Sequence, residues 1–364
     1  MALVAIDARE YSTSTGRYIE RLLHYLMQTK SEHQFLVLLK PGDMDKFKPT
    51  NLNFKAVECD YKEFSASEQT GFKKLLDGLG ADLVHFGMTQ QPVRYRGKTV
   101  TTIHDLTTLR FYNPDKNRVV FGIKQKVYAQ VIKKAARKAE AIITPSEFVK
   151  NDLVKFSGIN PAKVAVTYEA ADAIKEAPTP LPDLQNSKFI MYVGRPTPHK
   201  NLERLIEAFS SLRATHPDLK LVLVGKKDAN YSRIEADVLK RGIKGVVFSG
   251  FVSEGQLGWL YENTEAYVFP SLSEGFGLPG LEAMVHGAPV VSSNATCLPE
   301  IYGEGARYFD PLNVGDMENA INSVLTDGKL RKKLIYLGHK QASKYSWKRM
   351  AEQTLEVYNK ALKS

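Results

Sequence analysis

Short apolar runs that alternate with amphipathic helical patterns are the feature of this sequence that most restricts its fold. Helical spacing of i, i+3, i+4, i+7 is clear in Ile19, Leu22, Leu23 and Leu26, which predicts a helix with one buried face. Strands that alternate with such helices predict an α/β fold with parallel sheets. In the first half the apolar runs are LVAID near residue 5, HQFLVLL (33–39), DLVHF (82–86), TVTTIHD (99–105), AIITPS (141–146) and KVAVTY (163–168).

The same alternation restarts at residue 188, with KFIMYVG, LKLVLVG, GVVFSG, AYVFPS and APVVSS. A chain of 364 residues exceeds what one hydrophobic core usually supports, so we expect two domains. Between the two series, three closely spaced prolines oppose both helix formation and sheet pairing. We therefore predict a first domain at 1–172, a linker at 173–187 and a second domain at 188–344.

Composition narrows the class of protein and its location. The chain is 43% hydrophobic and 25% charged, which is typical of a globular protein in water. No apolar run approaches the roughly 18 residues that cross a bilayer, and the apolar stretch after Met1 is short for a signal peptide. We expect a cytoplasmic protein. Cys59 and Cys297 lack the spacing of a zinc site or a disulfide framework, so we expect both in the core.

The formal net charge of +10 favours a polyanionic partner, such as nucleic acid, an anionic membrane or the phosphates of a small ligand. A nucleic-acid-binding protein would interleave basic and stacking aromatic residues on one surface. The motif residues instead follow predicted strands, where a small ligand binds in an α/β fold. We therefore expect a phosphate-bearing small ligand and no nucleic acid.

The densest chemical signal is SLSEGFGLPGLEAM at 271–284, directly after a predicted strand. Pro279 is suited to the first turn of a helix, which places Glu274 on the preceding loop and Glu282 in the opening turn. Carboxylates there suit the hydroxyls of a sugar or ribose, and the glycines let a phosphate approach free backbone N–H groups. The alternative is a glycine-rich turn with two solvated glutamates.

A second set of residues follows the strand KFIMYV, in the segment GRPTPHKN. Arg195 and Lys200 lie in this strand-to-helix connection, where two cations would bracket a diphosphate. The alternative is a solvated pair of charges at a helix start.

These motifs, in the order GRPTPHKN, VLVGKKD, FSGFVS, PSLSEGFGLPGLEAM and APVVSSNATCLPEIYGEGARYFDP, closely resemble the donor domain of family 4 glycosyltransferases of the GT-B fold. The resemblance implies two Rossmann-like domains with parallel sheets facing across a cleft. It also implies that the final helix, about 345–364, crosses back to the first domain. The activity implied is transfer of a sugar from a nucleotide-sugar donor.

The resemblance also implies roles for individual residues. Arg195 and Lys200 would contact the donor diphosphate, Glu282 the ribose hydroxyls, and Glu274 the transferred hexose. The base would lie near Gly225 and the backbone of 251–252. The full predicted donor-binding set is Gly16, Gly194, Arg195, Lys200, Gly225, Phe251, Val252, Glu274, Gly275, Phe276, Gly277, Leu278 and Glu282.

The first half offers fewer candidates. His104 ends a predicted strand and precedes Asp105, and although a lone histidine is more often structural, this position favours a functional one. The resemblance implies that His104 donates a hydrogen bond to the transferred sugar and its phosphate, and that Gly16 forms a turn facing the diphosphate. The predicted catalytic residues are His104, Arg195, Lys200 and Glu274. We expect Ser146 only to cap a helix.

The resemblance further implies retention of anomeric configuration, with the departing phosphate accepting the acceptor's proton. Two cations and a helix N-terminus would neutralise that phosphate, so we expect neither a metal nor a cofactor. The one D-x-D, Asp43-Met44-Asp45, lies in a Pro-Gly turn without a ligand cluster. The chain looks most like bacterial α-mannosyltransferases that use GDP-mannose, but UDP-glucose and UDP-N-acetylglucosamine enzymes share these motifs, and an epimerase of similar fold is an alternative.

The segment 116–140 is rich in Lys and Arg, with no acidic residue before Glu140. Lys126, Lys133 and Arg137 share one helical stripe, and an apolar stripe begins with Val120. One interpretation is a helix packed on the first domain with a solvated charged face. The other is peripheral contact with anionic lipid headgroups at the cytoplasmic face of the membrane. The second fits an acceptor that is a glycan or a lipid-linked glycan, as in many relatives.

Overall fold

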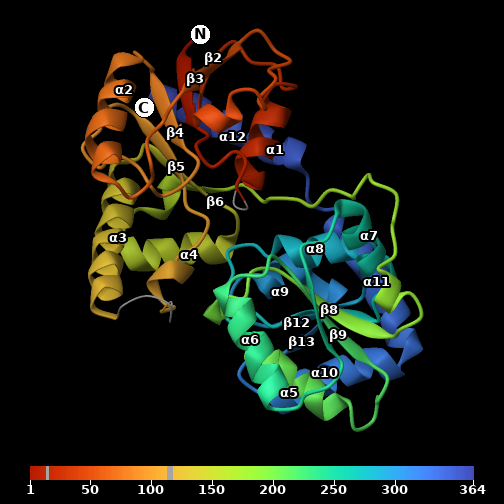
Figure 1. The fold of residues 1–364 in the computed structure, drawn as a ribbon. Helices are drawn as coiled ribbons and strands as arrows, with labels where there is room; N and C mark the ends of the chain where they lie inside the picture. Colours follow the sequence, from red (N-terminus) through yellow and green to blue (C-terminus); the bar gives the residue numbers. More distant parts are fainter. Residues whose placement is uncertain (14–15, 113–117) are drawn as a thin grey trace. The chain divides into compact units, whose positions relative to one another are not determined.

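The computed structural model describes residues 1–13, 16–112 and 118–364, and the chain divides into two compact units (Figure 1). Unit 1 comprises Met1–Arg110, Pro114–Glu169 and Ser346–Ser364. Unit 2 comprises Phe111–Asn113 and Ala170–Tyr345. The segment predicted as a linker, 173–187, falls within unit 2. Both units are α/β with parallel sheets, as the alternating pattern predicts.

Unit 1 is built on a seven-stranded sheet in the order β3-β2-β1-β4-β5-β6-β7. All its pairings are parallel, and β1 pairs with both β2 and β4, so the strand order reverses beside β1. The sequence patterns predict every strand except β3. The strands are β1 (Leu3–Asp7), β2 (Gln34–Leu39), β3 (Phe54–Glu58), β4 (Leu83–Phe86), β5 (Thr99–Thr102), β6 (Ala141–Thr144) and β7 (Val164–Val166).

The helices of unit 1 cover its sheet with their apolar faces. Ile19, Leu22, Leu23 and Leu26 are at most 3% exposed, which confirms the predicted buried face. The final helix packs beside the first and against β4, β5 and β6, so the chain returns to unit 1 as predicted. The helices are α1 (Arg17–Leu26), α2 (Lys73–Gly78), α3 (Arg118–Lys138), α4 (Glu147–Ser157) and α12 (Trp347–Lys363), with a π-helical turn at Glu68–Phe72.

The two ends of α3 differ in burial. In its second half Ile132 and Ala136 are fully buried in the core of unit 1. In its first half Val120, Ile123 and Val127 are 51–59% exposed. The helix thus packs on unit 1 through its second half, while these three residues of its apolar stripe are exposed. Residues 116 and 117, where the predicted basic segment begins, lie outside the described part of the chain.

Unit 2 is built on a six-stranded parallel sheet in the order β10-β9-β8-β11-β12-β13. Its strands are β8 (Phe189–Val193), β9 (Lys220–Val224), β10 (Val246–Gly250), β11 (Ala266–Phe269), β12 (Val290–Ser293) and β13 (Ala306–Phe309). Its helices are α5 (Leu202–Leu212), α6 (Ala229–Lys240), α7 (Glu254–Asn263), α8 (Leu278–Val285), α9 (Leu298–Tyr302), α10 (Val314–Thr326) and α11 (Gly328–Ala342).

Three further expectations concern the whole chain. Cys59 and Cys297 are both free and buried, as predicted. Over the residues described, the structure contains no helix long and apolar enough to cross a membrane. Asp43 of the D-x-D accepts a hydrogen bond from Lys46 at 2.8 Å, and although burial opposes the charged form, Lys46 and Ser12 hold the pKa of Asp43 below its usual value.

Candidate functional site in unit 2

The point where the strand order of unit 2 reverses brings two predicted motifs together. β8 pairs with β9 on one side and with β11 on the other, so their connections leave in opposite directions. Ligands of open α/β sheets bind at the carboxyl ends of strands beside such a reversal. The turn after β8 carries Lys200, and the turn after β11 carries Glu274.

Lys200 and Glu274 form an ion pair between these two turns. The Lys200 Nζ lies 2.6 Å from the Glu274 Oε1, and the side chains are only 18% and 12% exposed. The ammonium also lies 5.6 Å from the centre of the Phe269 ring. The backbone N–H of Glu274 donates to the hydroxyl of Thr296 at 3.0 Å. The predicted cation and carboxylate thus share one site and hold each other in place.

Asn201 ties the turn after β8 to its neighbours. Its backbone is left-handed, with φ of 62°, and its amide donates to the carbonyls of Pro270 and Pro311 at 3.0 and 2.8 Å. The backbone N–H of Leu272 donates to the carbonyl of His199 at 2.7 Å. The loops that carry Lys200 and Glu274 are therefore fixed by buried hydrogen bonds, and the ion pair is preorganised.

The glycine-rich turn packs against a tyrosine. Gly277 has a φ of 93°, and its carbonyl accepts a hydrogen bond from the Tyr302 hydroxyl at 2.5 Å. A Cβ added at Gly280 would lie 2.2 Å from the same hydroxyl oxygen. The sequence motif predicts these glycines for the approach of a phosphate. The structure gives them a second reason, since no side chain fits beneath Tyr302.

Glu282 is the fifth residue of α8, one residue beyond the opening turn in which the sequence predicts it. Its Oε2 accepts a hydrogen bond from the Tyr261 hydroxyl at 3.3 Å. Its carbonyl pairs with the Nδ1 of His286 at 2.8 Å, while the Nε2 of His286 accepts from the backbone of Ile174. Burial lowers the pKa of His286, which keeps this ring neutral. The carboxylate is thus oriented by a tyrosine that the sequence does not reveal.

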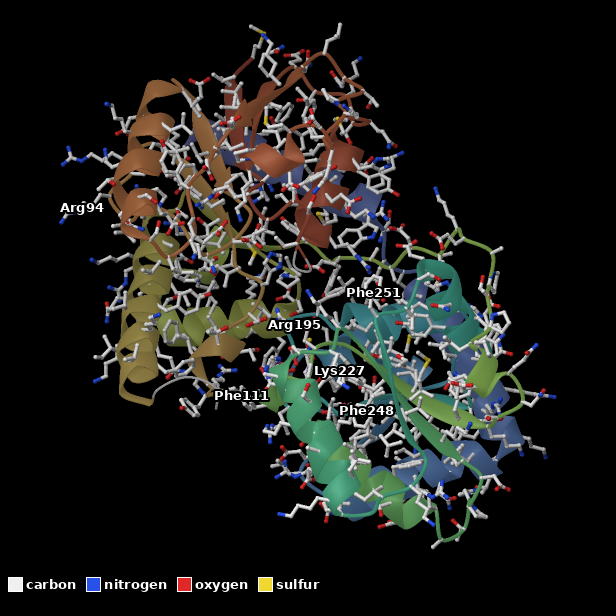
Figure 2. All side chains as sticks on the ribbon, in the orientation of Figure 1. Arg94, Phe111, Arg195, Lys227, Phe248 and Phe251 are labelled. Carbon is white, nitrogen blue, oxygen red and sulfur yellow. The ribbon has the colours of Figure 1, made fainter. Side chains whose placement is uncertain are left out.

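The predicted base-binding residues follow β9 and β10, beside the end of β8. The N–H of Gly225 donates to the carbonyl of Gly250 at 3.1 Å, and a Cβ at Gly225 would lie 2.5 Å from the carbonyl oxygen of Gly194. The Tyr231 hydroxyl donates to that same carbonyl of Gly194 at 2.9 Å. Phe251, labelled in Figure 2, is 85% exposed beside this row of backbones.

Of the remaining predicted residues in unit 2, Arg195 is exposed and Phe276 is buried. The Arg195 side chain is labelled in Figure 2, and its carbonyl accepts a hydrogen bond from the Tyr192 hydroxyl at 3.4 Å. The Phe276 ring meets the Tyr345 ring edge-on at 5.7 Å. Gly275 and Leu278 complete the turn between these residues, with Leu278 as the first residue of α8.

His104 lies in unit 1, two residues after β5, and both of its ring nitrogens have acceptors. The Nε2 lies 3.0 Å from the carbonyl of Gly87, and the Nδ1 lies 3.3 Å from the Oε1 of Glu169. Burial lowers the pKa of His104, but Glu169, the Gly87 carbonyl and Asp105 together raise it above its ordinary value. The predicted hydrogen bond from His104 to a sugar remains a prediction.

Gly16 precedes α1 in unit 1. A Cβ at this position would lie 1.9 Å from the carbonyl oxygen of Glu10, so the fold itself requires glycine here. Whether Gly16 faces a diphosphate remains a prediction. Ser146 caps α4 by accepting a hydrogen bond from the N–H of Val149 at 3.2 Å, as expected.

Solved structures share the architecture of this chain at low sequence identity. Sucrose-phosphate synthase from Thermosynechococcus elongatus matches with a TM-score of 0.79 at 18% identity, over 99% of this chain and 98% of its own. Anabaena Alr3699/HepE, solved in complex with UDP-glucose, matches with a TM-score of 0.74 at 17% identity, over 99% and 100% of the two chains. Two parallel Rossmann-like units of this kind define the GT-B class of fold.

Sequence comparison narrows this class to a family. Residues 15–173 match Glycosyltransferase Family 4, and residues 174–341 match Glycosyl transferases group 1. O-antigen chain mannosyltransferase B from Escherichia coli is 32% identical over 278 residues, which cover 72% of this chain and 70% of the relative. The chain belongs to glycosyltransferase family 4, and it is a glycosyltransferase.

Proposed function

We propose that this glycosyltransferase transfers mannose from GDP-mannose to a hydroxyl of a glycan or lipid-linked glycan, with retention of anomeric configuration and without a metal. The pairing of Lys200 with Glu274 at the strand reversal of unit 2 carries the proposal. The choice of mannose is supported by the similarity to the O-antigen chain mannosyltransferase B of Escherichia coli.

The proposed chemistry assigns a separate task to each charged group. Lys200 and Arg195 bind the diphosphate and stabilise the charge that develops as the sugar–phosphate bond breaks. Glu282 accepts hydrogen bonds from the ribose, and Glu274 accepts them from the hexose once the phosphate engages Lys200. The acceptor hydroxyl attacks from the face that the phosphate leaves, and the departing phosphate takes its proton. Catalysis is then positioning and charge stabilisation.

We infer independence from metal because unit 2 offers positive charge of its own at the proposed diphosphate site. Two cations and the positive end of α8 supply what a divalent ion would supply to a leaving diphosphate. In the described ranges, no group of three or more His, Cys, Asp or Glu side chains is arranged to hold a metal ion.

A UDP-sugar is the alternative donor. It is supported by HepE, whose structure contains UDP-glucose. The proposed base site lies near Gly225 and the backbone of 251–252. Contacts made through the backbone would leave no trace in side-chain identity, so the sequence does not reveal which base is bound.

The donor proposal is tested by thermal shift and product analysis with GDP-mannose, UDP-glucose, UDP-N-acetylglucosamine and GDP, each with and without EDTA. We expect GDP-mannose to stabilise the protein most and to be consumed equally in EDTA. If only a UDP-sugar stabilised the protein, the donor would be that UDP-sugar and not GDP-mannose. Strict metal dependence would overturn the proposed mechanism, and turnover of the donor without any acceptor would favour an epimerase.

We also propose that α3 contacts anionic lipid at the cytoplasmic face of the membrane. The exposed Val120, Ile123 and Val127 recur at helical spacing on one side of this helix, the long yellow one in Figure 1. Lys124 and Lys134 continue the same side and are also exposed. An apolar stripe flanked by lysines suits insertion at the headgroup level, where each nearby cation adds about 1 kcal/mol.

Vesicle co-sedimentation tests the lipid contact. We expect binding to phosphatidylglycerol vesicles that weakens with salt and that falls when Val120, Ile123 and Val127 are all changed to Ser. Leu239→Ser is the matched control, since Leu239 is 75% exposed in unit 2. Binding that ignores vesicle charge, or that survives the triple change, would reject the contact and leave α3 as a solvated basic helix.

A further inference from the structure

Glu169 is a buried carboxylate of unit 1 that the sequence motifs do not single out. Glu169 is only 5% exposed, and its Oε1 lies 3.3 Å from the Nδ1 of His104. It is also the last residue of unit 1 before the chain enters unit 2 at Ala170. A carboxylate this buried needs a charged or hydrogen-bonding partner, and His104 provides one.

The His104 ring is held from three directions. The Gly87 carbonyl lies 3.0 Å from the Nε2, and Glu169 faces the Nδ1. The Tyr18 ring lies edge-on at 4.8 Å between centroids, with an interplanar angle of 80°. Both nitrogens face acceptors, and only a doubly protonated imidazole donates to both. The geometry therefore selects the charged form of the ring.

The other groups around His104 are compatible with a positive charge. Asp105, next in the chain, adds a negative charge that favours it. His85, on the adjacent β4, would oppose it if charged, but burial and the His104 charge lower the pKa of His85 to about 3. Burial raises the pKa of the Tyr18 hydroxyl, which therefore stays neutral. Around His104, Glu169 is thus the buried carboxylate that balances the ring.

We propose that Glu169 is a positioning residue for sugar transfer, which holds His104 as an oriented imidazolium at the carboxyl edge of the sheet of unit 1. This inference rests on the proposed function and on the predicted role of His104 in transfer. In this proposal His104 contributes to transfer as a fixed positive charge and not as an acid or base that exchanges its proton. Glu169 sets that charge without touching the substrate.

An imidazolium of this kind gives activity a defined dependence on pH. Transfer falls as the pH rises through the value at which His104 loses its proton. Glu169→Gln keeps the shape of the side chain and removes its charge, so His104 should lose its proton at a lower pH. At pH 8 we then expect kcat to fall about tenfold, and at pH 6 to stay within about twofold of wild type. Glu169→Asp keeps the charge and should recover most of the rate.

The test combines NMR titration of isotope-labelled histidines with kcat measured from pH 6 to pH 9. The His104 signal is assigned by its loss in His104→Gln. Glu58→Gln, which neutralises an exposed carboxylate at the end of β3, is the matched control and should change neither quantity. A downward shift of both the His104 titration and the alkaline limb of kcat in Glu169→Gln is the expected result.

Two results would overturn the proposal. One is a wild-type His104 that titrates at or below the ordinary histidine value. This measurement uses the wild-type protein, so it does not depend on whether a variant folds. The other is a loss of rate in Glu169→Gln that is equal at pH 6 and pH 8, as a purely structural role would give. Failure of the proposed function is distinguishable, because wild-type protein would then transfer no sugar while the NMR titration still reports on the pair.

Discussion

Lys200 and Glu274 form an ion pair with 2.6 Å between the ammonium and the carboxylate, and the pair joins the turns after two adjacent strands of unit 2. Without a ligand, each charge satisfies the other. In the proposed function, a diphosphate bound to the ammonium would compete with Glu274 and free its carboxylate to accept hydrogen bonds from hydroxyls. Without a donor, Lys200 and Glu274 would thus pair with each other. With a donor bound, Lys200 would contact the phosphate and Glu274 the sugar.

Lys200→Met should therefore impair catalysis strongly. The change removes a cation from the leaving phosphate and leaves the Glu274 carboxylate without its partner. Loss of one preorganised electrostatic contact typically costs about 10²- to 10³-fold in rate, and we expect kcat/KM to fall by that amount. Lys240→Met, at the exposed end of α6, is the matched control and should behave as wild type. Equal turnover in the two variants would contradict the role of Lys200.

Glu282→Ala should weaken nucleotide binding. Hydrogen bonds to a charged group are worth about 1.5–3 kcal/mol, so the dissociation constant should rise at least about tenfold in calorimetric titrations with GDP. Tyr261→Phe removes only the hydroxyl that orients Glu282 and should have a smaller effect. A Glu282→Ala protein that binds GDP as tightly as wild type would exclude the ribose contact.

Arg195→Ala should also weaken binding of the nucleotide, because it removes a cation from the proposed diphosphate site. The Arg195 side chain is exposed, so folding should be unaffected. We expect GDP to raise the melting temperature of the variant less than that of wild type. Arg241→Ala, an exposed change at the end of α6, is the control. An identical response of both variants to GDP would argue against Arg195.

His104→Ala should slow transfer and leave nucleotide affinity nearly unchanged. His104 belongs to unit 1, whereas the charged groups proposed to bind the diphosphate and the ribose, Arg195, Lys200 and Glu282, belong to unit 2. Steady-state kinetics and GDP titration together separate the two effects. Unchanged turnover in this variant would reject a role for His104, and with it the inference on Glu169.

The sequence predicts most of the sheet because buried parallel strands are continuous apolar runs. β3 and β13 are the exceptions. Both are edge strands, and exposed charged residues, Lys55 and Glu58 in β3 and Arg307 in β13, interrupt the apolar pattern. The outward face of α3 also escapes prediction. Helical spacing identifies Val120, Ile123 and Val127 as one stripe, but it does not say whether anything covers that stripe.

In the candidate site, too, the sequence predicts some features and misses others. Motif order and the rule for strand ends predict that Lys200 and Glu274 lie at one edge, but nothing in the sequence predicts that they touch. The contacts that support the site are harder still to predict from the sequence. Tyr302 is distant in the chain from Gly277, which it contacts, and Glu169 is distant from His104. Partners that meet only through the fold leave no local pattern.

Gly280→Ala should destabilise unit 2. The new Cβ would lie 2.2 Å from the hydroxyl oxygen of Tyr302, within the buried contact that holds the glycine-rich turn. Overpacking of this kind typically costs about 1–3 kcal/mol, so the melting temperature should fall. Gly78→Ala is the control, because a Cβ there meets nothing within 4 Å. If both variants melt at the same temperature, Gly280 does not pack closely against Tyr302.

The final prediction concerns acid stability and rests on His85, which is fully buried between the Tyr358 hydroxyl at 2.6 Å and the Thr102 hydroxyl at 2.9 Å. Burial, reinforced by His104, lowers the pKa of His85 from 6.5 to about 3. Below pH 6.5, His85 is therefore protonated in the unfolded chain but stays neutral in the folded chain. Stability falls as the pH falls from 6.5 towards 3, by about 1.4 kcal/mol for each pH unit from this residue.

His104 has the opposite sign, because its pKa is raised in the folded state, so its contribution is complete below the ordinary histidine value and is lost as the pH rises. Urea unfolding midpoints between pH 7.5 and pH 5 separate the two residues. His85→Gln should lower stability at neutral pH but flatten its decline in acid, whereas His24→Gln, an exposed change on α1, should leave the slope as in wild type. An acid slope that is unchanged in His85→Gln would mean that His85 is already protonated in the folded protein or does not stay buried.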